Sequence, residues 1–301
     1  CPGWRPVALL QRRVWAMPAC LMDPTRDETM ADQSASPAEV DLLIENGVIV
    51  PMDAAGQILY NGLLAVEQGA ILAVGRQEAL AGKYTGRTTI DDLEWRVLDR
   101  LDELNVGTWF PPMFYILRAG PDGAGGADTR VIKPGDLLRC DIGIGSCGLV
   151  SDVQEVAYVP REGETEAPRG LRDALALGNR LQDILLGEFR EGRTGNEILA
   201  AALSKARAAG LFPRIYSHPI GFHGHGAGTR IGLPDMQDGV PGMGDYPLYP
   251  ETCHAIELGV TAKIPEWGGR EIFMALEEDA VFTGGRVVWL DGRQTDIILV
   301  R

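Results

Sequence analysis

The sequence predicts an α+β fold with antiparallel sheets, because strand-like and helix-like patterns mix without the regular alternation of a βαβ protein. Short apolar runs such as "VIKPGDLLRCDIGI" follow turn signals and are typical of strands. Two amphipathic helices are predicted over residues 166–187 and 194–210. After Gly210 the chain is rich in glycine, proline and aromatic residues with short strand-like runs. These features favour one larger α+β domain.

The pattern divides the chain into three parts. Residues 1–40 show no clear periodicity, so we expect an irregular or disordered lead-in. Residues 41–84 contain short β-rich runs separated by the turn signals "ENG" and "EQG". A different pattern follows and runs from residue 85 to residue 301, where we expect the main domain.

A helix is predicted at the start of the main domain. Thr89 or Asp91 can cap its N-terminus, and Gly107 can end it. The helix carries an apolar stripe at helical spacing, made of Leu93, Val97, Leu101 and Leu104. The next run, "TWFPPMFYILRAG", is strand-like, and we expect its aromatic residues in the core, with a pocket lining as the alternative.

Composition excludes some classes of function. Of the 301 residues, 45% are apolar and 23% charged, which is ordinary for a globular protein. The net charge of −14 argues against a nucleic-acid or anionic-membrane partner. No apolar run reaches the roughly 18 residues of a membrane span. Five cysteines without a CxxC pair favour reduced thiols, so we expect a cytoplasmic protein.

Two acids end apolar runs in "CDIGIGSCGLVSD", residues 140–152. A hairpin that turns at Ser146 and Cys147 would place Asp141 directly opposite Asp152, with Cβ atoms about 5 Å apart. Carboxylates that close repel, and the pKa of one rises unless a cation lies between them. A divalent metal ion would be such a cation. The alternative is that both are ordinary strand-end residues.

Further candidate ligands lie downstream. Three of the chain's four histidines are close together in "YSHPIGFHGHGAGTRIG": His218, His223 and His225. Neighbouring glycines let the backbone approach another group closely. Two apolar, strand-like runs carry acids, Glu257 in "AIELG" and Glu277 with Glu278 in "LEEDAVFTGG". The alternatives are loop histidines with local hydrogen bonds and acids held in salt bridges.

Together these motifs resemble those of the pita-bread metallopeptidases. The matching stretches are "IKPGDLLRCDIGI", "GLVSD", "GHGAG", "AIELG" and "LEEDAVFTGG", and the resemblance covers roughly residues 85–301. That family includes Xaa-Pro aminopeptidase, methionine aminopeptidase and prolidase, with creatinase as a metal-free relative. The resemblance implies the pita-bread fold, a peptide or small-molecule amide substrate, and a homodimer.

The resemblance also implies roles for five residues. Asp141 would bind one metal ion through both oxygens, Asp152 and Glu277 would bridge two ions, and His225 with Glu257 would bind the second. The cofactors would be two divalent ions of Mn, Co, Zn or Fe, which polarise the scissile carbonyl and supply hydroxide at neutral pH. Glu257 would also carry a proton to the leaving amine. The implied activity is that of an Xaa-Pro aminopeptidase or dipeptidase.

The sequence departs from the family pattern at two places. Many members have a second histidine seven residues after the one in GHG, where this chain has Gly232; His218 or His223 could take that catalytic role. A helix and a strand that usually open the domain are also missing. In their place, residues 41–84 resemble the N-terminal β segment of amidohydrolases and related deaminases, but no HxH motif in a barrel context follows.

Two alternatives stay open on the same fold. One is a metal-free C–N hydrolase like creatinase, against which the four clustered acids argue. The other is a non-catalytic binding protein, which would bind metal without turnover.

Overall fold

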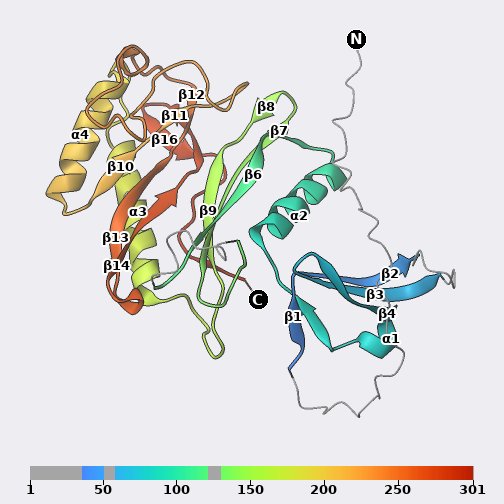
Figure 1. Cartoon of the computed structure of the whole chain (residues 1–301). Helices are drawn as coiled ribbons and strands as arrows, with labels where there is room; N and C mark the ends of the chain where they lie inside the picture. The colour runs from blue at the N-terminus through green and yellow to red at the C-terminus, as the bar shows by residue number, and fades with distance from the viewer. Residues whose placement is uncertain (1–35, 51–57, 121–129, 301) are drawn as a thin grey trace, which may run out of the picture.

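The computed structural model describes residues 36–50, 58–120 and 130–300, so most of the predicted lead-in lies outside the described residues. Figure 1 shows a β-rich N-terminal segment beside a larger α+β domain, as the sequence predicts. None of the helices in the described ranges has the length and apolar character needed to cross a membrane.

The N-terminal segment consists of short strands around a small core. Its elements are β1 (Ala38–Val40), β2 (Leu42–Ile49), β3 (Leu59–Glu67), β4 (Ala70–Arg76), α1 (Gln77–Leu80) and β5 (Tyr84–Gly86). Strands β2, β3 and β4 form an antiparallel sheet, and β1 pairs in parallel with β5. The buried residues are Val40, Leu63 and Ala65, a separate core from that of the larger domain.

The first half of the larger domain is a helix followed by an antiparallel sheet. Its elements are α2 (Ile90–Glu103), β6 (Gly107–Leu117), β7 (Leu137–Ser146), β8 (Leu149–Val150) and β9 (Val153–Tyr158), with β17 (Ile298–Leu299) added at the edge of β9. Thr89 caps α2 as predicted. Its hydroxyl accepts from the Asp92 amide, and the Asp92 carboxylate accepts from the Thr89 amide.

The second half repeats this arrangement with one more helix. Its elements are α3 (Arg169–Leu186), α4 (Gly195–Ala208), β10 (Pro213–Ile215), β13 (Leu258–Ile264) and β14 (Arg270–Leu276). Sheet order β10-β13-β14 matches β6-β7-β9, and α4 precedes β10 as α2 precedes β6. In the described residues α3 has no counterpart before α2.

A third sheet is made of short strands that follow β10 in the chain. It contains β11 (His218–Pro219), β12 (Thr252–Ala255), β15 (Asp279–Thr283) and β16 (Arg286–Trp289). Two short 3-10 helices, Met243–Asp245 and Pro265–Trp267, lie in the loops. The half-sheets meet where the Gln154 amide donates to the Glu277 carbonyl at 2.9 Å, so β9 runs beside the end of β14.

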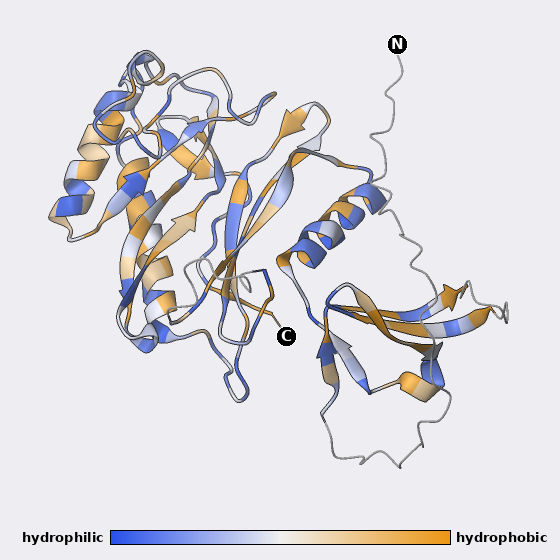
Figure 2. Cartoon of the chain, in the orientation of Figure 1, coloured by the Kyte–Doolittle hydropathy of each residue, from blue (hydrophilic) through white to orange (hydrophobic). Residues whose placement is uncertain are grey.

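The main core lies between the second half-sheet and its helices, where Figure 2 shows apolar residues on α3, α4 and the strands beneath them. Helix α3 approaches the sheet closely because small residues face it. A Cβ atom on Gly178 would stand 2.3 Å from Leu276 Cδ1, so the leucine side chain would have to move for any larger residue. Leu171, Leu181 and Leu185 on the same helix are fully buried. This packing fixes the strands that carry the candidate site.

The hairpin between Asp141 and Asp152 forms, but the predicted register was wrong by two residues. The turn lies at Cys147 and Gly148, whose φ angles of 53° and 80° suit a two-residue hairpin turn. Asp141 therefore pairs with Gln154 rather than with Asp152. Because a shift of two residues keeps every side chain on its face, both acids still share one side of the sheet.

Candidate metal centre

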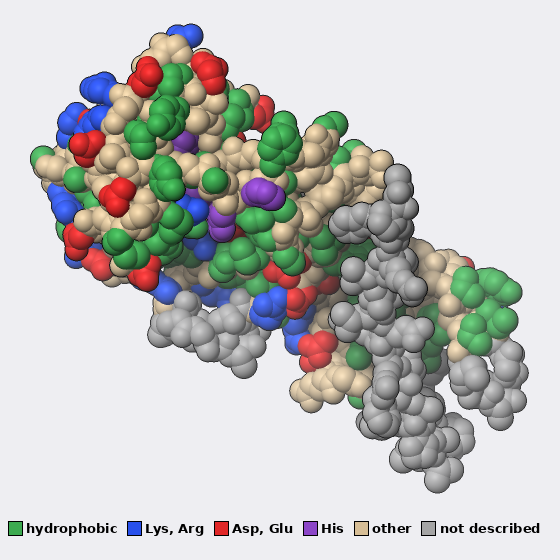
Figure 3. Space-filling view, turned by 90° about the horizontal axis from the view of Figure 1, so that it is seen from above, with side chains coloured by type: hydrophobic (Ala, Val, Ile, Leu, Met, Phe, Trp, Pro, Cys, Tyr) green, Lys and Arg blue, Asp and Glu red, His purple; other side chains and the backbone are tan. Residues whose placement is uncertain are grey.

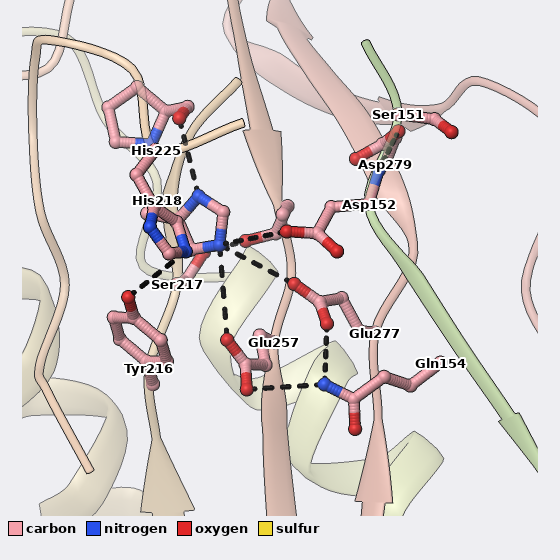
Figure 4. A network of polar contacts seen from close by, with 12 residues as sticks. Ser151, Asp152, Gln154, Tyr216, Ser217, His218, His225, Glu257, Glu277 and Asp279 are labelled. Atoms are coloured by element: carbon pink, nitrogen blue, oxygen red, sulfur yellow. Dashed lines mark hydrogen bonds and ion pairs between the residues drawn. The ribbon is translucent and has the colours of Figure 1, made fainter. Parts of the chain in front are cut away.

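Five side chains of metal-binding types converge between the two half-sheets. Figure 4 shows Asp152, His218, Glu257 and Glu277 of this set. They are Asp141 on β7, Asp152 directly before β9, His218 on β11, Glu257 between β12 and β13, and Glu277 directly after β14. Ligand atoms lie within 4.8 Å of one another in the groups Asp141–Asp152–Glu277 and His218–Glu257–Glu277. Strand pairing thus brings together acids from distant parts of the sequence.

The imidazole of His218 faces the carboxylates of the cluster. Its Nε2 lies 3.6 Å from Asp152 Oδ2, 3.5 Å from Glu277 Oε1 and 3.9 Å from Glu257 Oε2. Its Nδ1 lies 3.3 Å from the carbonyl oxygen of Pro219, which can only accept. Nδ1 therefore carries the proton, and the lone pair of Nε2 points at the carboxylates. This is the orientation of a metal-binding imidazole.

Gln154 and Asp279 hold the acids in place. The Gln154 amide nitrogen donates to Glu277 Oε2 at 2.6 Å and to Glu257 Oε1 at 3.3 Å. The Asp152 backbone amide donates to Asp279 Oδ2 at 3.1 Å. These bonds leave Glu277 Oε1 and the Asp152 carboxylate directed toward His218 (Figure 4).

Burial raises the pKa of every acid of the cluster, and repulsion between carboxylates adds to the rise for all but Asp141. Burial, with repulsion from Glu277, raises the pKa of Asp152 to about 10. The same two causes raise the pKa of Glu257 to about 9, and burial raises the pKa of Glu277 well above its ordinary value. Burial alone raises the pKa of Asp141 to about 6, against the field of Arg139.

The cluster fits a divalent metal ion. His218 Nε2 and Glu277 Oε1 are buried, and neither has a hydrogen-bond partner in the described part of the chain. Within those residues no lysine or arginine forms an ion pair with any of the four acids. Buried carboxylates without cations are costly, and a set of carboxylates with one imidazole suits Mn, Fe, Co or Zn.

The two remaining predicted histidines lie differently. His225 contacts the cluster edge, with its ring centroid 4.6 Å from that of His218, and it forms a group with Asp152 and His218. His223 is exposed and belongs to none of the ligand groups in the described residues. The structure thus brings His218 and His225 to the acids but leaves His223 outside.

Gly232 cannot be replaced by a histidine in this backbone. Its φ is +77°, and a Cβ atom there would lie 2.2 Å from the carbonyl oxygen of Ile215. His225, by contrast, lies seven residues after His218, which is the spacing that the family resemblance attaches to the metal-binding histidine and its partner. The spacing therefore fits His218 as the first histidine of the pair.

His225 is held by aromatic rings. Trp109 packs edge-on against it with ring centroids 5.3 Å apart, and Tyr216 Oη lies 3.3 Å from His225 Nε2. The Trp109 ring fits closely because Gly143 and Gly224 flank it, where a Cβ atom would lie 1.9 Å or 2.0 Å from the indole. Figure 3 shows histidine side chains reaching the surface among hydrophobic ones. The exposed edge of His225 thus faces solvent beside the cluster.

Three contributing residues were not predicted from the sequence: Gln154, Tyr216 and Asp279. Gln154 follows Asp152 by two residues, and alternation along a strand puts both on the same face, so this signal was available. Glu278, which the sequence analysis passed over in favour of Glu277, belongs to none of the ligand groups in the described residues. Its carboxylate accepts from the Gln294 amide and from Gln182 on the other side of the strand.

Comparison with known proteins agrees with this geometry. The model of metallopeptidase family M24 matches residues 52–283, more than three quarters of the chain. The chain belongs to metallopeptidase family M24. Membership confirms the resemblance and the pita-bread fold inferred from the motifs.

Solved structures show the same fold. The chain matches a dipeptidase from Pyrococcus horikoshii (21% identity, TM-score 0.52, 71% of this chain and 55% of the other). It matches an X-Pro aminopeptidase from Thermotoga maritima with 18% identity and a TM-score of 0.53, over 71% of this chain and 56% of the other. It also matches the N-terminal domain of FACT complex subunit SPT16 from chickpea, Cicer arietinum, with 11% identity and a TM-score of 0.52, over 72% of this chain and 53% of the other. The M24 chain thus spans about half the length of these proteins.

Two curated proteins match short stretches. Both are 5-methylthioadenosine/S-adenosylhomocysteine deaminases of Nitratidesulfovibrio vulgaris, 34% identical over 55 residues and 25% identical over 120 residues. The chain covers only 12% and 26% of their lengths. They belong to the class that residues 41–84 resemble, and the brevity of the matches carries no activity over to this chain.

Proposed function

We propose that this M24 chain is a dinuclear metal-dependent peptidase of the Xaa-Pro aminopeptidase or dipeptidase type. The observation that carries the proposal is the convergence of Asp141, Asp152, His218, Glu257 and Glu277, with His218 Nε2 and Glu277 Oε1 buried and unpartnered in the described residues. The named activities of the Pyrococcus and Thermotoga proteins support the substrate class.

The residues would divide the ligand roles by position. Asp152 and Glu277 belong to ligand groups on both sides of the cluster, so they are the candidates to bridge two ions. Asp141 occurs only in the group without a histidine, which suits a ligand of the first ion. Glu257 and His218 share a group with Glu277 and would hold the second. His218 replaces His225 in this assignment because its ring is buried among the acids.

Catalysis would then depend on groups at the edge of the cluster. Bound divalent ions polarise a carbonyl and lower the pKa of a water molecule. Glu257 is partly exposed and can move a proton between the solvent side and the leaving amine. His225, fixed by Trp109 and Tyr216, can donate a hydrogen bond to the scissile carbonyl oxygen.

A second candidate is a protein that binds peptides on this fold without cleaving them. The similarity to a FACT subunit domain, whose name states no enzymatic activity, favours keeping it. Creatinase-like chemistry without metal is less suited to four clustered acids that lack cations. A homodimer and a cytoplasmic location stay predictions.

The test is hydrolysis of Xaa-Pro peptides by protein supplied with Mn, Co, Zn or Fe in turn. Release of the N-terminal residue, abolished by Asp152→Ala, would support the peptidase. Metal binding without turnover of any peptide would support the binding protein.

A further inference from the structure

We propose that one face of the β2-β3-β4 sheet is an interface at which two copies of this chain associate face to face. We call it the open face, and it carries six apolar side chains: Leu42, Ile44, Leu64, Val66, Ile71 and Val74. The inference does not depend on the proposed peptidase function, because it rests on the N-terminal segment alone.

The six side chains form two rows that run across all three strands. Strand pairing gives the rows Leu42–Val66–Ile71 and Ile44–Leu64–Val74. Residues directly opposite one another on neighbouring strands lie on the same side of a sheet, so each row is a continuous apolar strip. The next row is Gly47–Gly62–Arg76, so the first charge along this side of the sheet lies at the border of the open face.

The open face is exposed in spite of its apolar composition. Four of its side chains have large exposed fractions, 42% for Leu42, 41% for Ile44, 66% for Ile71 and 41% for Val74. The two residues on the central strand are partly buried. An antiparallel sheet with one side in water normally carries polar side chains on that side. Contiguous exposed apolar side chains instead mark sites of interaction.

The charged groups of the segment gather near the other side of the sheet. Leu63 and Ala65, which alternate with the open-face residues of β3, lie in the small core on that side. At its edge Arg87 forms ion pairs with three acids, Glu39, Asp41 and Glu67. The covered side therefore holds the ion pairs and the open side holds the apolar rows, which is the reverse of what contact with water favours.

The segment needs a further layer, because its own core is small. Its fully buried apolar residues are Val40, Leu63 and Ala65. So small a core gives a sheet little stability by itself. A second sheet stacked on the open face, about 10 Å away, would bury both apolar rows and make a sandwich of the two sheets.

Charge favours a second copy of the chain as the source of that sheet. The net charge is −14, so two copies repel one another wherever their charged surfaces meet. The two rows contain no charged side chain, so copies can meet there without this cost. For the same reason the open face offers no ion pair to an acidic or basic partner. A two-fold axis brings the same patch of both copies together, so that each covers the other.

The size of the open face sets the strength of the association. A standard interface uses about 20–30 residues from each partner, whereas the open face supplies six. We therefore expect a reversible dimer with a Kd in the micromolar range.

The experiment is sedimentation velocity of the full-length chain over about 1–100 μM, compared with Ile44→Asp and Val74→Asp. A buried, unpaired carboxylate in either row should raise the Kd of the dimer at least about tenfold. Val48→Asp is the matched control. Val48 is 65% exposed on the same strand as Ile44, but it adjoins Gly47 of the third row and so points to the opposite side. Its Kd should stay within about twofold of the wild type. Circular dichroism checks that each variant is folded.

A second measurement needs no loss of association. The thiol introduced by Ile71→Cys is labelled with a maleimide, and peptide mass spectrometry gives its rate of modification at each protein concentration. A rate that falls as the concentration rises through the Kd would support the interface. A fast rate at every concentration would show that nothing covers the open face, and a slow rate at every concentration would assign it to another segment of the same chain. Either result would overturn the proposal.

Two outcomes of the sedimentation experiment would also overturn it. One is a wild-type chain that stays monomeric over the whole range of concentration. The other is a dimer whose Kd is the same in Ile44→Asp, Val74→Asp and the wild type, because its interface would then lie elsewhere. Neither outcome bears on the peptidase function, which the peptide hydrolysis test decides separately.

Discussion

His218 Nε2 lies 3.5 Å from Glu277 Oε1, and both atoms are buried without a hydrogen-bond partner in the described chain. The two residues come from different sheets, 59 positions apart in the sequence, so packing rather than local structure sets their distance. Lone pairs on both atoms face one another, which is unfavourable unless a cation lies between them. This pair is the centre of the proposed metal site.

Replacing His218 by alanine should remove metal binding. Because His218 supplies the imidazole in the acid cluster, we expect His218→Ala to weaken metal affinity by about 10–100-fold or more, with peptidase activity lost in parallel. Calorimetric titration with Mn²⁺ measures the affinity. His223→Ala is the control, since that exposed side chain lies outside the cluster. Equal losses in both variants would contradict the assignment of His218.

Replacing His225 should separate catalysis from metal binding. If His225 orients the scissile carbonyl, His225→Ala should lower kcat by about 10²-fold while metal affinity changes little. Steady-state kinetics with parallel Mn²⁺ titration checks this. A loss of metal affinity as large as that of His218→Ala would instead make His225 a ligand, as the GHG motif first suggested.

The metal-free protein should lose stability as the pH rises from 7 to 9. Burial and repulsion from Glu277 raise the pKa of Asp152 to about 10 and that of Glu257 to about 9. Over this range the unfolded chain has already released these protons, whereas the folded chain still holds them, so rising pH favours unfolding. The pKa of His218, lowered by burial to about 4, lies below this range.

Thermal unfolding across that range, with and without Mn²⁺, measures the effect. Metal binding needs deprotonated carboxylates, so the rise in Tm on adding metal should be larger at pH 8.5 than at pH 7. Asp152→Asn should flatten the slope of the metal-free protein. A metal-free Tm that is constant or increasing from pH 7 to 9 would show that the acids are not buried together.

A methyl group at Gly224 should disturb the site through Trp109. The added Cβ would lie 2.0 Å from Trp109 Cζ2, so the indole must move, and its contact with the His225 ring must change. We expect Gly224→Ala to destabilise the fold by about 1–3 kcal/mol and to lower kcat. Gly221→Ala is the matched control in the same loop, because its Cβ would meet nothing within 4 Å. Urea unfolding that gives equal stability for both variants would contradict this packing.

Local patterns were enough to predict much of the fold. The capping residue Thr89, both amphipathic helices and the β-rich segment before them follow from spacing and turn residues. The hairpin register did not follow, because the sequence "SCG" allows a turn at either of two positions. The left-handed conformation of Cys147 and Gly148 places the turn at these two residues and so sets the register of the hairpin. An even shift preserved the shared face of Asp141 and Asp152, so the register error does not separate these two predicted ligands.

The choice between the two histidines depends on contacts that the motif does not state. The letters "GHGAG" point to His225, but the burial of His218 against Asp152 and Glu277 arises from pairing between β11 and β12, which the sequence does not state. Nor does the sequence show that a side chain at Gly232 would clash with the carbonyl oxygen of Ile215. Similarly, Gln154 takes its role from the bridge between β9 and the end of β14, a contact between residues 123 positions apart.

The most direct test is the metal content of the wild-type protein and of Asp152→Ala, purified without chelator and measured by elemental analysis. The proposed centre predicts about two divalent ions per chain in the wild type and their loss in the variant, with the variant still folded. Absence of metal from the wild type, even after Mn or Co is added back, would contradict the dinuclear centre and leave the metal-free alternatives.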